Sequence, residues 1–94
     1  MNVPHEKIAD LAAKLGVDAD FLERCLEEEI VIEANWIEEG DLPSAAATRM
    51  RSLQRICRAL DIDEFSASLI LELRERLEIM ERELDFLRTY RHPS

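Results

Sequence analysis

Residues 63–90 read DEFSASLILELRERLEIMERELDFLRTY, and this stretch decides the fold. It contains neither glycine nor proline, and strong helix formers, chiefly leucine, glutamate and arginine, dominate it. We expect one uninterrupted helix, which at 1.5 Å per residue would be about 42 Å long. A domain of 94 residues is too small to cover a helix of that length, so part of its apolar surface needs a partner.

Apolar residues recur in this stretch in alternating steps of three and four, which is an a/d heptad seam typical of a two-helix supercoil. The predicted dimerisation residues are Ile70, Leu73, Leu77, Met80, Leu84 and Leu87. The simplest partner is a second copy of the chain, so we predict a homodimer. The orientation stays open, because Arg76 with Glu81 suits a parallel pair and Arg76 with Glu83 suits an antiparallel one. The first turns, near Phe65 and Leu69, are expected to pack on the preceding helix.

The chain before this helix is predicted to begin with a helix-turn-helix over residues 5–29. Residues 5–15 form its first helix, which Gly16 ends in a left-handed conformation. Asp18 is a good N-cap for the second helix, over residues 19–29.

Two further elements connect this unit to the long helix. Residues 30–40 carry β-branched residues on both sides of an Ala-Asn pair, which predicts a small β wing. Residues 41–60 are expected to form a third helix with Asp41 as its N-cap, Pro43 in its first turn and Leu60 facing inward. The predicted fold class is therefore mostly α, a single domain over residues 1–94 with a long C-terminal dimerisation helix.

The composition and the pattern of apolar residues limit where in the cell we expect the protein. No apolar run approaches the ~20 residues of a membrane span, and no signal-peptide pattern opens the sequence. We therefore expect a cytoplasmic protein that does not contact a membrane. The two cysteines, Cys25 and Cys57, fall on apolar helical faces and are expected to be reduced core thiols.

The sequence offers no convergent set of catalytic groups. His5 and His92 lie near the two ends of the sequence, and the motifs of hydrolases, nucleotide-binding loops and zinc sites are absent from it. The acidic runs lack the fixed ligand spacing of a selective metal site. We therefore expect neither an enzyme nor a bound metal or cofactor.

The net charge of −9 is unevenly distributed. Residues 17–41 hold ten acids against Arg24 alone, whereas residues 42–60 hold four arginines and no acid. Such an acidic segment repels phosphate backbones and attracts a basic protein surface. The outward residues of the second helix, mostly acids, would read DNA poorly. The arginines of the third helix, which we expect to pair with nearby acids, are Arg49, Arg51, Arg55 and Arg58.

Two segments resemble a known superfamily. Residues 8–17 (IADLAAKLGV), followed by an Asp-capped helix, resemble the opening of MerR-type winged helices, and residues 51–62 (RSLQRICRALDI) resemble the helix and corner before the MerR dimerisation helix. Within that superfamily the chain is more similar to the chaperone-modulatory CbpM family. The points of likeness are the GV-acid helix, residues 30–33 (IVIE), Trp36 before an acidic pair, and the Leu-rich final helix.

The resemblance implies a MerR-like winged helix-turn-helix that binds the J-domain of a DnaJ-like co-chaperone of the CbpA type and blocks its stimulation of DnaK. J-domains present a basic helix to DnaK, so an acidic protein would compete for the same charges. Charge and placement, rather than a family motif, select the partner-binding residues. These are Glu23, Glu27, Glu28, Glu33, Trp36, Glu38 and Glu39.

The alternative is a MerR-type DNA-binding transcriptional regulator. Those regulators carry an aromatic-rich Arg-Tyr-Tyr after the start of the second helix and a Gly-Tyr-Arg wing. This chain has Glu23-Arg24-Cys25 and residues 35–38 (NWIE) in the equivalent places. These replacements lack phosphate-binding groups, which favours the protein-binding interpretation.

Overall fold

The computed structural model describes residues 4–30 and 42–91, and within them the chain is helical. The helices are α1 (His5–Leu15), α2 (Ala19–Glu27), α4 (Ser44–Leu60) and α5 (Glu64–Arg91), and the described ranges contain no strand. The prediction of a mostly α fold is confirmed. The predicted β wing lies outside the described residues except for Ile30, which is buried in the core.

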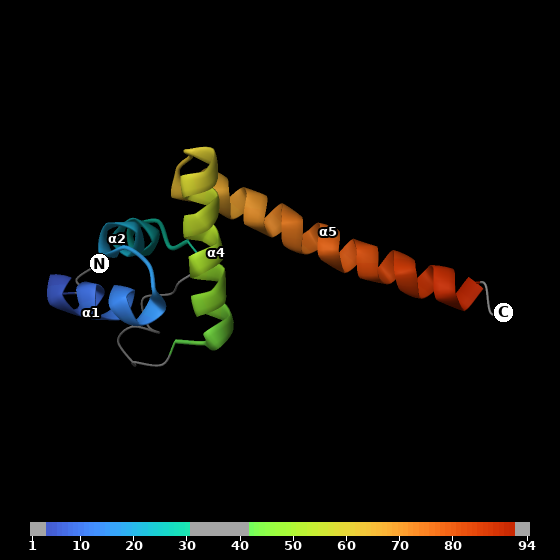
Figure 1. Ribbon diagram of the computed structural model, residues 1–94, viewed down its shortest axis with the longest axis horizontal. Helices are drawn as coiled ribbons and strands as arrows, with labels where there is room; N and C mark the ends of the chain where they lie inside the picture. The colour runs from blue at the N-terminus through green and yellow to red at the C-terminus, as the bar shows by residue number, and fades with distance from the viewer. Residues whose placement is uncertain (1–3, 31–41, 92–94) are drawn as a thin grey trace.

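The first three helices form a body from which α5 projects (Figure 1). α1 packs against α2 and α4, whereas α5 packs against α4 and, at its start, against α2. The centre of the core consists of the fully buried side chains Leu22, Cys25, Met50 and Leu53. Around them lie buried residues from α1 and α5, which are Ile8, Ala12, Leu15, Ala67 and Leu71. None of the helices in the described ranges is both long and apolar enough to cross a membrane.

Three helices end in the same way. A residue with positive φ lies just beyond each helix, namely Gly16 (77°) directly after α1, Glu29 (53°) two residues after the end of α2, and Asp61 (53°) directly after α4. The next residue is apolar in each case, and its N–H donates to the carbonyl five positions earlier. These bonds run from Val17 to Ala12, from Ile30 to Cys25 and from Ile62 to Cys57, at 3.1, 2.9 and 3.2 Å. This is the Schellman arrangement, which satisfies a helix-end carbonyl and turns an apolar side chain back towards the core.

The helix starts differ in part from the prediction. α4 begins at Ser44 with Pro43 at its N-cap position, and the predicted cap Asp41 lies outside the described residues. Asp18 does occupy the N-cap position of α2, but its carboxylate makes no cap bond and instead accepts from Arg58 at 2.5 Å. Asp63 caps α5, because its Oδ1 accepts the Ser66 N–H at 2.8 Å. Hydrogen bonds from Ser66 hold the pKa of Asp63 below its ordinary value.

The corner between α4 and α5 packs through other residues than predicted. Phe65 and Leu69 were expected on α4 and Leu60 in the core, yet these side chains are 57%, 46% and 56% exposed. Ala67 and Leu71 make the contact instead. The prediction was wrong because apolar periodicity does not say which side of a long helix faces the body when apolar residues occur on both sides.

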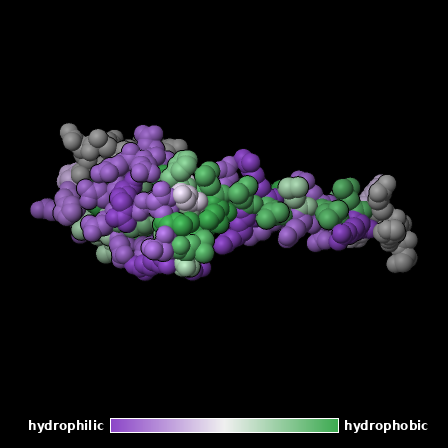
Figure 2. All heavy atoms as spheres, turned by 90° about the horizontal axis from the view of Figure 1, so that it is seen from above, coloured by the Kyte–Doolittle hydropathy of each residue, from purple (hydrophilic) through white to green (hydrophobic). Residues whose placement is uncertain are grey.

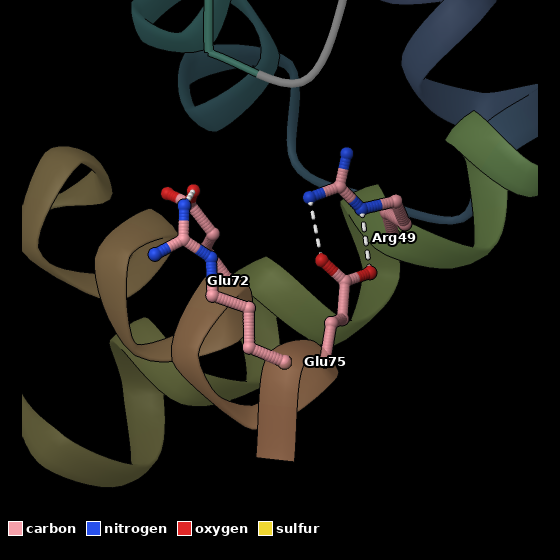
Figure 3. Close-up of polar contacts among 4 residues, drawn as sticks. Arg49, Glu72 and Glu75 are labelled. Atoms are coloured by element: carbon pink, nitrogen blue, oxygen red, sulfur yellow. Dashed lines mark hydrogen bonds and ion pairs between the residues drawn. The ribbon is translucent and has the colours of Figure 1, made fainter. Parts of the chain in front are cut away.

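An ion pair marks the point where α5 leaves the body. Arg49 of α4 donates from Nε and Nη2 to the two carboxylate oxygens of Glu75, both at 2.9 Å (Figure 3). From residue 76 to residue 90 every residue of α5 is exposed. The radius of gyration is accordingly 16.8 Å, against about 12 Å for a compact chain of this length.

Candidate interaction surfaces

The predicted seam on α5 is largely uncovered. Ile70 is half-buried and packs against the core, but the other five seam residues are exposed. Leu77 and Met80, at its middle, are 57% and 62% exposed. Figure 2 shows apolar side chains at the junction of α5 with the body and again along the projecting helix. Water contact with so many large apolar side chains is unfavourable, at about 25 cal/mol per Å² of apolar surface.

The seam and the core contact lie on different sides of α5. Ala67 and Leu71 face the body and are buried, whereas Leu69 and Leu73 each follow two residues later. Two residues correspond to a rotation of roughly 200° in an α-helix. Leu73 of the seam and the flanking Leu69 therefore point away from α4, whereas the first seam residue, Ile70, packs against the core. From Leu73 onward the chain's own body leaves the seam uncovered.

A second apolar group flanks the seam and was not predicted. Ile79, Phe86 and Tyr90 are exposed, and the rings of Phe86 and Tyr90 stack with centroids 6.3 Å apart. A surface hollow beside them is lined by Ile79, Arg82, Glu83, Phe86 and Leu87. In the heptad register, residues 79 and 86 are c positions and residue 90 is a g position. The signal was present in the sequence as apolar residues at c and g on one flank.

The acidic surface lies at the C-terminal end of α2. Glu27 and Glu28 are exposed there, Glu28 as the C-cap residue, while Glu23 is half-buried. Neither Glu27 nor Glu28 forms an ion pair with another described residue. Glu29, in the left-handed conformation, is exposed beside them. The other predicted partner-binding residues, Glu33, Trp36, Glu38 and Glu39, lie outside the described residues.

The arginines that could contact phosphates are largely engaged within the chain. Arg49 and Arg58 pair with Glu75 and Asp18, so the expected pairing with nearby acids is confirmed for these two. Arg51 and Arg55 form no ion pair with a described residue. The guanidinium of Arg51 donates to the Leu15 carbonyl oxygen at 3.2 Å.

The one arginine of α2, Arg24, is also occupied. It pairs with Glu64 at the start of α5, and this hydrogen bond raises the pKa of Arg24. Glu64 is itself mostly buried, so the pair ties α2 to α5. Four of the five arginines of α2 and α4 thus donate to a group elsewhere in the chain, which reduces their availability to a nucleic acid, and only Arg55 is exposed without such a contact among the described residues.

The two cysteines are free thiols, as predicted. Burial raises the pKa of Cys25 to about 12, and it also raises the pKa of the half-buried Cys57. Both are therefore protonated and poorly nucleophilic at neutral pH. Within residues 4–30 and 42–91, no group of three His, Cys, Asp or Glu side chains is placed to hold a metal ion.

No protein-family model matches the chain, and neither a curated protein nor a solved structure matches it at a significant level.

Proposed function

We propose that the protein is a homodimeric binding protein that covers the basic surface of a J-domain and thereby inhibits a DnaJ-like co-chaperone. The acidic end of α2 recognises the partner, and the seam of α5 joins the two copies. The class of partner rests on the resemblance to the CbpM family stated above. The charge distribution of the described residues supports this class independently.

One contrast carries the proposal. The acids at the end of α2 are exposed and unpaired among the described residues, while the arginines Arg24, Arg49 and Arg58 are held in ion pairs within the chain. The net field of this part of the surface is therefore negative. Complementary charge speeds association with a basic partner and disfavours a polyanion such as DNA.

The test measures binding of a purified J-domain to the Glu27→Lys/Glu28→Lys variant. We expect the dissociation constant to rise at least about tenfold, because two attractive charges become repulsive at the contact. Raising the salt concentration from 0.1 M to 1 M should also weaken wild-type binding steeply, since the screening length falls from about 10 Å to about 3 Å.

The matched control is Glu6→Lys/Asp10→Lys, which makes the same change of net charge at exposed positions of α1. This control should bind the J-domain nearly as well as the wild type. Equal loss in both variants would mean that only the total charge matters. Undiminished binding by the α2 variant, or specific binding of duplex DNA by the wild type, would contradict the proposal.

A further inference from the structure

Glu64, the first residue of α5, is the only buried carboxylate in the described ranges, with 9% of its surface exposed. A buried carboxylate is unfavourable unless it is paired. Its one ion-pair partner among the described residues is Arg24 of α2, whose Nε donates to Oε1 of Glu64. The side chain of Arg24 is 52% exposed, against 12% for that of Glu64. The position of the Arg24 guanidinium therefore depends on Glu64 rather than on packing.

Arg24 also has acids of its own helix as neighbours. Asp20, Glu27 and Glu28 lie four residues before it and three and four residues after it, and all three are exposed. The Glu28 N–H donates to the Arg24 carbonyl oxygen at 3.2 Å, so the helical spacing extends to Glu28. Opposite charges at these spacings commonly pair on a helix surface. Arg24 nevertheless pairs with Glu64 and with none of these three acids.

We infer that Glu64 is a positioning residue for the acidic surface: by holding Arg24 at the contact between α2 and α5, it keeps the charges of Glu27 and Glu28 available to a basic partner. Arg24 is the only basic residue of α2, so no other cation of this helix can neutralise them. Without Glu64, the guanidinium would pair with an acid of α2 and reduce the negative field there. The inference rests on the proposed function, and it adds that the first residue of α5 sets the charge that the partner meets.

Binding of a purified J-domain to the Glu64→Met variant tests the inference. Methionine fills the buried volume but offers no strong acceptor, so Arg24 loses its partner. We expect the dissociation constant to rise about fivefold, which is the effect of one exposed ion pair at the upper end of the usual range. The nearly isosteric Glu64→Gln takes its place if the methionine variant does not fold, and it should weaken binding in the same direction. Unchanged affinity in the folded variant would overturn the inference.

The matched control is Glu75→Met, which releases Arg49 of α4 from its ion pair in the same way. It changes the net charge by the same amount, but α4 contains no acid for the released guanidinium to neutralise. This control should bind the J-domain nearly as well as the wild type. Equal weakening by both variants would mean that only the total charge matters, which would also overturn the inference.

A second substitution separates the positioning of a charge from a purely structural role of the pair. Adding Arg24→Gln to the Glu64→Met variant should restore the lost affinity, because it removes the released charge. In the wild-type background, Arg24→Gln should change the affinity by less than about twofold, since Arg24 there lies against Glu64. A structural role predicts no such rescue, so an unrescued double variant would contradict the positioning role.

Carbon-13 NMR of the side-chain carboxyl groups follows the same displacement without a J-domain. Glu64→Met should shift the carboxyl resonance of at least one of Asp20, Glu27 and Glu28, and adding Arg24→Gln should reverse the shift. The absence of any shift would overturn the inference even if the wild type binds a J-domain. If the reversible shift appears but the wild type binds no J-domain, the proposed function alone fails and the positioning of Arg24 by Glu64 stands.

Discussion

At the scale of single residues, the three helix ends show the same left-handed backbone conformation at residues with different side chains. Gly16 adopts positive φ without a Cβ, whereas Glu29 and Asp61 adopt it with one. A left-handed conformation costs a non-glycine residue about 1–2 kcal/mol, although Asp tolerates it better than Glu. The end of α2 therefore stores strain beside the acidic surface.

The strain predicts opposite effects at two of these ends. Gly16→Ala should lower the free energy of unfolding by about 1 kcal/mol, and Glu29→Gly should raise it by a similar or smaller amount. The first effect is conformational, because a Cβ at residue 16 would meet nothing closer than Arg51 Cδ at 3.7 Å. Urea unfolding of both variants at one protein concentration measures the changes. Equal free energies of unfolding for the wild type and both variants would contradict the inferred backbone strain at these helix ends.

At the scale of the element, the part of α5 beyond the body gains no burial from the rest of the described chain. Isolated helical segments of about 15 residues are marginal in water, whatever their propensity. Residues 76–90 form such a segment, since each of them is exposed in the single chain. A supercoiled partner, as in the proposed homodimer, would supply the burial that the body does not.

Charge within the seam should therefore separate the copies. Leu77→Glu or Leu84→Glu is expected to give monomers in sedimentation velocity, because two carboxylates would be buried near each other in the dimer. Thr89→Glu adds the same charge at an exposed f position outside the seam and should leave the dimer intact. An unchanged dimer in the seam variants would refute the coiled-coil interpretation.

The helices that were predicted most accurately from the sequence are those with clear start and stop signals. α1 was predicted over its observed residues 5–15, and α5 was predicted within one residue at each end. α2 ends two residues earlier than expected, because Glu28 and Glu29 form its C-terminal turn. Helix propensity alone does not disfavour glutamate at these positions.

The packing side of α5 could not be predicted in the same way. Its sequence has apolar residues around most of its circumference, so heptad spacing identified the seam but not the face that meets α4. Ala67 decides that face, since a small side chain allows close approach and is fully buried. The small size of Ala67 is a weak signal in a sequence dominated by leucine.

At the scale of the whole molecule, the chain is a small body with a projecting arm, and its extents are 59 × 31 × 20 Å. The core is confined to the body, where α1, α2, α4 and the first turns of α5 meet. If half of α5 depends on a second copy, folding and association are linked. Stability then depends on protein concentration.

This linkage predicts a concentration-dependent melting temperature. The wild-type Tm should rise by several degrees over a hundredfold increase in protein concentration, because mass action favours the dimer and about 1 kcal/mol shifts the Tm of a domain this small by 4–8 °C. Leu77→Glu should melt at one temperature across the same range. A wild-type Tm that does not change with protein concentration would contradict this linkage, because the stability of the body would then not depend on association.

The repeated helix ends also limit how the chain length can vary. The connections between α1 and α2 and between α4 and α5 span only residues 16–18 and 61–63, and each carries both a left-handed residue and an apolar residue that returns to the core. An inserted or deleted residue there would displace the apolar residue and rotate the following helix. Homologous chains should therefore keep both connections at three residues. A change in the length of the connection before α5 would change the direction in which α5 projects from the body.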